Sequence, residues 1–195
     1  EEPDPMLTSL PNLLTLSRIA AIPLLLALIY VDTPLFRWLA FAGYVMACIT
    51  DYFDGYLARH MNQISPLGRF LDPIADKLLV ATLLVMLVAT QEIAGLEMIP
   101  AIVILAREIL VSGLREYLAE IKVSVPVTKL AKWKTGIQML ALGFLIVGDA
   151  GPAVIPVNLI GEIGLWIAGI LTAITGYDYM ARGLKHMVSQ ESGSR

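Results

Sequence analysis

Long apolar runs, separated by short polar connections, dominate this chain from end to end. The runs lack the strict alternation of apolar and polar positions that marks the strands of a membrane barrel. A helix needs about 20 predominantly apolar residues to cross the hydrocarbon layer of a membrane. The pattern predicts six membrane-spanning helices, over residues 10–31, 35–60, 72–90, 98–121, 129–148 and 157–182.

The connections between these runs contain proline, glycine and polar residues, as in "VDTPL" and "GDAGPAVIP", which is typical of turns. They are too short to separate independent domains. We therefore predict one membrane domain over residues 1–195, with short flexible ends at about 1–5 and 188–195.

The composition supports a membrane protein. Of the 195 residues, 57% are hydrophobic and 16% are charged, and the mean hydropathy is +0.72. Soluble domains contain about 45–50% apolar and about 25% charged residues. The fold class predicted is an all-α integral membrane protein, a bundle of six transmembrane helices.

Lysine and arginine gather on one side of the predicted membrane topology. They flank the second and fourth connections and follow the last span, whereas the other connections hold only Arg37. Because basic residues are enriched in short cytoplasmic loops, we expect both termini and the second connection to lie at the cytoplasmic face of the cell membrane. The expected partners include membrane lipids but no nucleic acid.

Cysteine and histidine chemistry is disfavoured. Cys48 is the single cysteine, so the chain has neither an intrachain disulfide nor a thiolate cluster. His60 and His186 are far apart in the sequence and near predicted span ends, which argues against a histidine metal site or a Ser-His-Asp triad.

Four aspartates stand out in the stretch "DYFDGYLARHMNQISPLGRFLDPIADK": Asp51, Asp54, Asp72 and Asp76. The first two are three residues apart and the last two are four apart, so each pair shares one face of a helix. Two neighbouring helix ends would bring all four carboxylates together, where they would repel one another. Mg²⁺ or Mn²⁺ would relieve that repulsion and prefers oxygen ligands.

Structural interpretations of these aspartates stay open. Asp72 stands before Pro73 and would serve as a helix N-cap. Asp51 and Asp54 would form structural ion pairs with Arg59, Arg69 or Lys77. Intramembrane ionisable residues are functional candidates by default, and four of them at this spacing favour a metal site.

Small residues accompany the aspartates. Gly55 and Ala58 lie on the face of Asp51 and Asp54 and would let a bulky or phosphorylated ligand approach the backbone, although small residues also promote helix packing in membranes. Arg59 offers a fork of donors that suits a diphosphate.

Read as D-x2-D-G-x2-A-R-x8-G-x3-D-x3-D, the stretch resembles the signature of the CDP-alcohol phosphotransferase family at every fixed position. The resemblance implies a six-helix bundle, a homodimer, and transfer from a CDP-linked donor to an alcohol with release of CMP. It assigns two divalent ions to the four aspartates, and Asp76 the role of general base. The CDP site implied by the resemblance comprises Gly55, Ala58, Arg59 and Gly68.

A second resemblance concerns the substrates. The segments "LPNLLTLSRI", "REILVSGLREYLAE" and "KWKTGIQ" are similar to those of family members that use CDP-diacylglycerol and glycerol 3-phosphate. The phosphate of that acceptor requires a cationic pocket. The candidates are Arg107, Arg115, Lys132 and Lys134.

Alternatives remain for these basic residues and for the substrate. Lys132 and Lys134 would also anchor the chain at lipid headgroups, and Glu108 would be a structural partner of Arg107. Arg18, about two turns into the first span, would face a polar cavity beside the metal-binding aspartates, and it is not assigned as a substrate ligand. Serine or inositol phosphate are other candidate acceptors, and a divalent-cation transport path is a candidate from another class.

Overall fold

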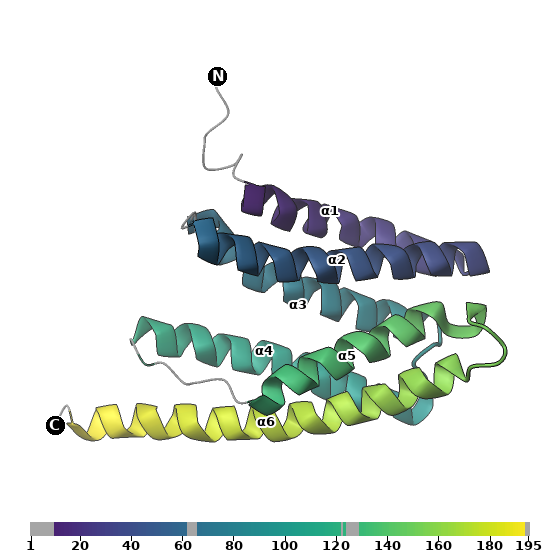
Figure 1. Cartoon of the computed structure of the whole chain (residues 1–195). Helices are drawn as coiled ribbons and strands as arrows, with labels where there is room; N and C mark the ends of the chain where they lie inside the picture. The colour runs from purple at the N-terminus through teal and green to yellow at the C-terminus, as the bar shows by residue number, and fades with distance from the viewer. Residues whose placement is uncertain (1–9, 62–65, 122, 124–128, 194–195) are drawn as a thin grey trace. The chain divides into compact units, whose positions relative to one another are not determined.

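A computed structural model of the chain describes residues 10–61, 66–121, 123 and 129–193. The described residues contain helices and connecting turns but no strand, which confirms the predicted all-α class. The elements in chain order are α1 (Leu10–Val31), α2 (Pro34–Met61), α3 (Pro66–Ala89), η1 (Gly95–Glu97), α4 (Met98–Glu120), α5 (Lys129–Val147), η2 (Gly148–Ala150) and α6 (Val157–Gly193) (Figure 1).

Two helix boundaries differ from the sequence prediction by more than one residue. Helix α3 begins at Pro66 instead of residue 72 and contains Pro73 in its interior. Proline is favoured at the first helical position, where its missing N–H leaves no bond unmade, so Pro66 is the start signal in this segment. Helix α6 continues to Gly193, and residues 188–193 of the predicted flexible end are therefore helical.

Three helical segments of the described residues are long and apolar enough to cross a membrane. They are Leu13–Val31, Leu130–Ala150 and Val157–Lys185, with mean hydropathies of 2.1, 1.3 and 1.8. The other three long helices, α2, α3 and α4, carry several charged residues within their length. The arrangement with six spans stays a prediction.

The chain forms two compact units. The first unit contains the described residues up to Glu92 together with Gly143–Asn158, and the second contains Ile93–Leu142 and the described residues from Leu159 onward. The chain enters the first unit twice because the last turn of α5, η2 and the start of α6 belong to it. The prediction of a single domain over 1–195 stays a prediction.

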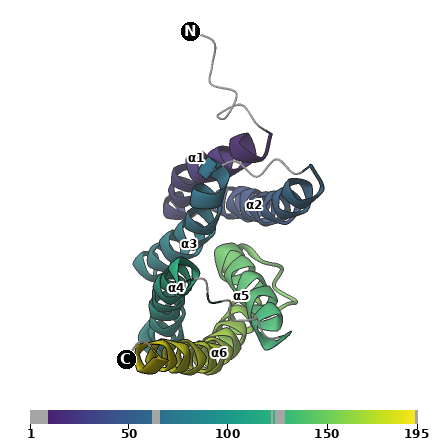
Figure 2. The same ribbon diagram turned by 90° about the vertical axis from the view of Figure 1, so that its left-hand side faces the viewer.

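Helix α1 is the packing centre of the first unit. It contacts both α2 and α3, and Figure 2 shows these helices nearly end on. Buried side chains recur at intervals of three or four residues, as helix packing requires. On α1 they include Ile22, Leu25 and Ile29. Gly43 of α2 brings the helices close, since a Cβ there would lie 2.7 Å from Leu25 Cδ2.

A buried arginine joins three connections at one end of this unit. Arg37 donates from Nε to Asp32 Oδ1 (2.6 Å) and from Nη2 to Glu92 Oε1 (2.5 Å). Gly148, with φ +51°, packs against both Arg37 and Glu92 where any side chain would collide with them. The indole of Trp38 donates to the carbonyl of Ala150 at 3.1 Å. Arg37, the one basic residue of its predicted side, therefore has a structural role.

The second unit is organised by a glycine repeat on α6. Gly169, Gly176 and Gly183 each lie where a Cβ would press on α4, at Pro100, Arg107 and Leu114 in turn. Both series advance by seven residues in the same direction, so α4 and α6 run parallel in close contact. Helix α5 approaches α6 where Gly164 meets Ala141. Figure 2 shows α4, α5 and α6 as neighbouring rods.

Candidate active site

The aspartate-rich segment meets a buried arginine in the first unit. Arg18 Nη1 on α1 donates to Asp51 Oδ1 of α2 (2.6 Å) and to Asp76 Oδ1 of α3 (2.8 Å). The Arg18 side chain is 1% exposed, whereas those of Asp51 and Asp76 are 33% and 50% exposed. Side chains from three helices therefore converge on one guanidinium nitrogen.

This convergence tests whether the aspartates suit a divalent ion. Carboxylate oxygens from two helices already approach a single positive group to hydrogen-bond distance. Their donor atoms are hard oxygens, which Mg²⁺ and Mn²⁺ prefer, and their partial exposure leaves them accessible to an ion. The two aspartates whose side chains are described suit such a cation, and the ion itself stays a prediction.

The remaining members of the signature are described only in their backbone. Gly55, Ala58 and Arg59 follow Asp54 on α2, while Gly68 precedes Asp72 on α3. Their side chains lie outside the described part of the structure. Among the side chains that are described, no group of three or more Asp, Glu, His or Cys residues converges, so the four-aspartate cluster stays a prediction.

The cap interpretation of Asp72 is wrong. An N-cap residue precedes the first helical turn, whereas Asp72 and Pro73 lie inside α3, which begins at Pro66. Because Asp72 and Asp76 belong to one continuous helix, their spacing of four residues does place them on one face.

A second polar cluster lies in the second unit. Glu108 Oε1 of α4 accepts from Lys134 Nζ of α5 at 2.5 Å and from Arg107 Nη1 at 3.1 Å. The side chains of Lys134 and Arg107 are only 4% and 15% exposed. The predicted pairing of Arg107 with Glu108 is confirmed, and the anchoring interpretation of Lys134 is wrong, since its ammonium group is buried instead of reaching headgroups.

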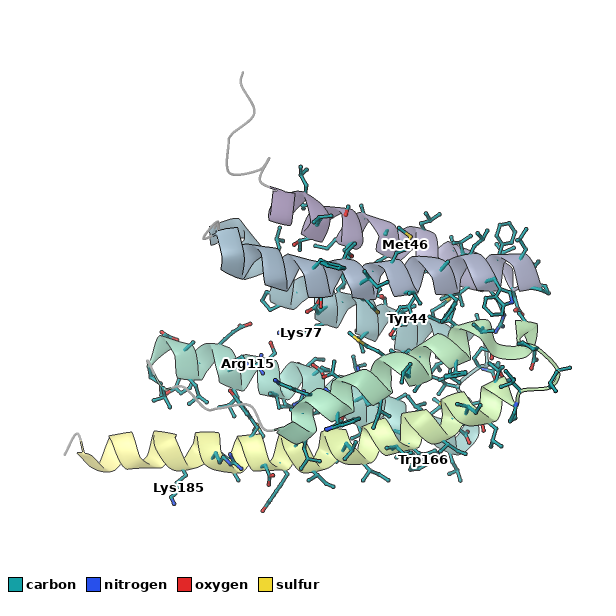
Figure 3. The ribbon with its side chains drawn as sticks, viewed as in Figure 1. Tyr44, Met46, Lys77, Arg115, Trp166 and Lys185 are labelled. Carbon is teal, nitrogen blue, oxygen red and sulfur yellow. The ribbon has the colours of Figure 1, made fainter. Side chains whose placement is uncertain are left out.

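The other two predicted acceptor residues have different surroundings. Arg115, two turns beyond Glu108 on α4 (Figure 3), places its guanidinium carbon 5.9 Å from the ring centroid of Tyr179 on α6, in the range of a cation–π contact. Lys132 is exposed. At 3.6 residues per turn it lies about 200° around α5 from Lys134, so anchoring at headgroups remains the better interpretation for Lys132.

The sequence placed Arg18 beside the aspartates, as observed. It did not predict that Arg18 pairs with Asp51 and Asp76, or that Lys134 pairs with Glu108. A charged residue within an apolar span requires a partner, and Arg18 in "LLTLSRIAAIPLLL" carries that signal. The signal does not name the partner, because Asp51 and Asp76 are 33 and 58 residues away in the sequence.

Three described helices long and apolar enough to cross a membrane, accompanied by two clusters of charged side chains, indicate a helical membrane protein. Residues 8–174 match the family described as CDP-alcohol phosphatidyltransferase. The chain belongs to this family, which confirms the resemblance of the aspartate signature.

Relatives of the chain cover most of its length. It is 53% identical over 171 residues to a CDP-diacylglycerol–glycerol-3-phosphate 3-phosphatidyltransferase of Rickettsia bellii, covering 88% of this chain and 93% of that protein. A protein of the same name from Cereibacter sphaeroides is 36% identical over 219 residues, with 94% and 99% covered. A CMP-forming cardiolipin synthase of Oryza sativa is 42% identical over 160 residues, with 75% and 48% covered.

Proposed function

We propose that this protein transfers the phosphatidyl group of CDP-diacylglycerol to glycerol 3-phosphate, giving phosphatidylglycerol phosphate and CMP. The observation that carries the proposal is the family's aspartate signature on α2 and α3, where Asp51 and Asp76 meet at one cationic group. The substrates follow from the name of the Rickettsia bellii relative, which is similar over nearly its whole length.

In this reaction the acceptor's hydroxyl oxygen attacks the phosphorus that bears diacylglycerol. A new P–O bond forms, the P–O bond to CMP breaks, and the hydroxyl proton leaves. Asp76 is the proposed base for that proton, and its half-exposed side chain supports the assignment because an alcohol can reach it. Arg18 would hold the carboxylate in a fixed orientation for the transfer.

The proposed cofactors are two Mg²⁺ or Mn²⁺ ions. Asp51, Asp54, Asp72 and Asp76 would hold them. When bound, they would neutralise charge on the diphosphate and on departing CMP. Gly55, Ala58, Arg59 and Gly68 would form the CDP site, with Arg59 donating to the diphosphate.

The cationic cluster of the second unit is the proposed site for the acceptor's phosphate. Arg107 and Lys134 supply two positive charges, and both side chains have little contact with solvent. Ionic hydrogen bonds to a phosphate are strong there because little water competes for the same donors. Arg115 would add a third charge. Lys132 is exposed and is the least suited of the four predicted acceptor residues to a site shielded from water.

The remaining proposals concern the membrane and assembly. Six spans with both termini in the cytoplasm would place the signature at the cytoplasmic face of the cell membrane, where the headgroup of CDP-diacylglycerol lies. The acyl chains of that donor would remain in lipid. A homodimer is proposed from the family alone.

The test is CMP release by the purified protein in liposomes that contain CDP-diacylglycerol. Glycerol 3-phosphate, serine, inositol and inositol phosphate are supplied separately, each with Mg²⁺, with Mn²⁺ or with chelator. Among the four acceptors, we expect only glycerol 3-phosphate to support CMP release, and only when Mg²⁺ or Mn²⁺ is present. Release with a different acceptor would overturn the assigned substrate, and release in chelator would overturn the cofactor.

A further inference from the structure

We infer that Glu108 is an internal substitute for the acceptor's phosphate, and that it sets how strongly and how selectively the cationic cluster binds that group. This inference rests on the proposed function, because it concerns the acceptor site named there. It goes further in assigning an opposing role to a residue of the same cluster.

The geometry shows one carboxylate oxygen serving two cations. Glu108 Oε1 lies 2.5 Å from Lys134 Nζ and 3.1 Å from Arg107 Nη1. These are the two cations, Lys134 buried and Arg107 largely buried, that the proposed function assigns to the acceptor's phosphate. A phosphate oxygen that binds both must therefore share them with Glu108 Oε1 or take its place.

Burial makes the negative charge of Glu108 necessary. Lys134 is 4% exposed, and a buried ammonium group without a counter-charge is costly. Arg107 is fixed by its side-chain packing on Gly176 as well as by Glu108. In the folded protein without ligand, Glu108 thus supplies the negative charge that keeps both cations in place.

A phosphate dianion has what is needed to compete with a single carboxylate. It offers more acceptor oxygens and a larger negative charge. Arg107 also has a donor to spare, since its buried Nε has no hydrogen-bond partner in the described part of the chain. An uncharged alcohol has no negative charge with which to replace the Glu108 carboxylate. Glu108 would therefore select acceptors that carry a phosphate.

Replacing Glu108 by glutamine separates this role from simple support. Glu108→Gln keeps an oxygen for the two donors but removes the charge that competes with phosphate. We expect glycerol 3-phosphate to bind on the order of tenfold more tightly, as the loss of one nearby like charge allows. The variant should also unfold at a lower temperature without ligand, because buried Lys134 and largely buried Arg107 lose their counter-charge.

The measurements are titration calorimetry with glycerol 3-phosphate, inorganic phosphate and glycerol on the full chain in phosphatidylcholine nanodiscs, and KM for glycerol 3-phosphate in CMP release. Glycerol should bind measurably to neither the wild type nor Glu108→Gln. Glu116→Gln is the matched control, since it removes the same charge from an exposed position on α4 and should bind glycerol 3-phosphate like the wild type.

Equal or weaker phosphate binding by Glu108→Gln would overturn the inference and make Glu108 a support for Arg107 and Lys134. If that variant does not fold, Glu108→Asp replaces it: its carboxylate is drawn back by one methylene, so binding tighter than wild type is expected and equal or weaker binding overturns the inference. CMP release by the wild type judges the proposed function separately. Absence of release, with tighter phosphate binding by the variant, would overturn the function but not the role of Glu108.

Discussion

Each polar cluster has at its centre one residue whose charge is opposite to that of the residues around it. Arg18 lies between two carboxylates in the first unit, and Glu108 lies between two cations in the second. Like charges brought together would oppose folding unless a counter-charge is present, and the cost rises with burial. Each cluster therefore folds around its own counter-charge, and each proposed ligand carries the same sign as the residue in the middle.

The role of Asp76 as base leads to the first prediction. Asp76→Asn should lower turnover by about 10²–10⁴-fold, the range for loss of a general base, while CDP-diacylglycerol still binds. CMP release and donor binding are the measurements. Because Asp76 is also a proposed metal ligand, Mn²⁺ binding by electron paramagnetic resonance must be measured in parallel.

Retained Mn²⁺ binding with lost turnover would assign the defect to proton transfer. Asp178→Asn, at an exposed position of α6, is the control and should keep full activity. Turnover like that of the wild type in Asp76→Asn would remove Asp76 as the base.

Arg18 leads to a prediction about stability. Arg18→Gln removes the cation shared by Asp51 and Asp76 and leaves their charges facing one another. We expect a loss of about 1–3 kcal/mol in chelator, below the 3–5 kcal/mol typical of fully buried pairs because both carboxylates are partly exposed. Mg²⁺ should restore more stability to this variant than to the wild type.

Unfolding midpoints in chelator and in Mg²⁺ measure this difference. Arg18→Lys, which retains the charge, should show a smaller loss in chelator. A loss of equal size in chelator and in Mg²⁺ would mean that Arg18 acts only as a packing residue.

At the scale of helices, the seven-residue glycine repeat of α6 sets the distance to α4. A Cβ at Gly176 would lie 2.7 Å from Arg107 Cγ, whereas one at Gly136 of α5 would meet nothing within 4 Å. Gly176→Ala should therefore destabilise the protein by about 1–2 kcal/mol through overpacking. It should also raise KM for glycerol 3-phosphate by displacing Arg107.

Gly136→Ala is the matched control. Alanine is better than glycine inside a helix by about 0.5–1 kcal/mol, so this variant should be unchanged or more stable. Unfolding midpoints and KM for both variants provide the comparison. Equal effects of the two substitutions would show that α6 does not depend on close contact at Gly176.

The sequence predicted the helices well because apolar length determines them. Five of the six predicted spans start within one residue of an observed helix, and the exception is α3, where Pro66 instead of Pro73 starts the helix. Pairings between helices were harder. The contact of Lys134 with Glu108 depends on how α5 is turned towards α4, which periodicity on either helix alone does not determine.

At the scale of the whole molecule, the chain's division into two units was not evident from its composition. Apolar runs and short connections continue across all three boundaries between the units, and only three-dimensional contacts separate the units. The proposed reaction assigns the donor's diphosphate to residues of one unit and the acceptor's phosphate to residues of the other. A common membrane topology is therefore a requirement of the proposed function, and it can be tested directly.

The prediction of six spans assigns opposite sides of the membrane to two exposed positions. Val154, in the connection between α5 and α6, is 93% exposed, and Lys185 lies exposed towards the end of α6. In a Cys48→Ala background, Val154→Cys should react with a membrane-impermeant maleimide in cells whose outer barriers are opened but whose cell membrane is intact. Lys185→Cys should react only after that membrane is permeabilised.

Leu96→Cys, in the connection before α4, should react like Val154→Cys because an even number of spans separates the two connections. Reaction at position 185 in intact cells would reverse the orientation, and different behaviour at positions 96 and 154 would reduce the number of spans.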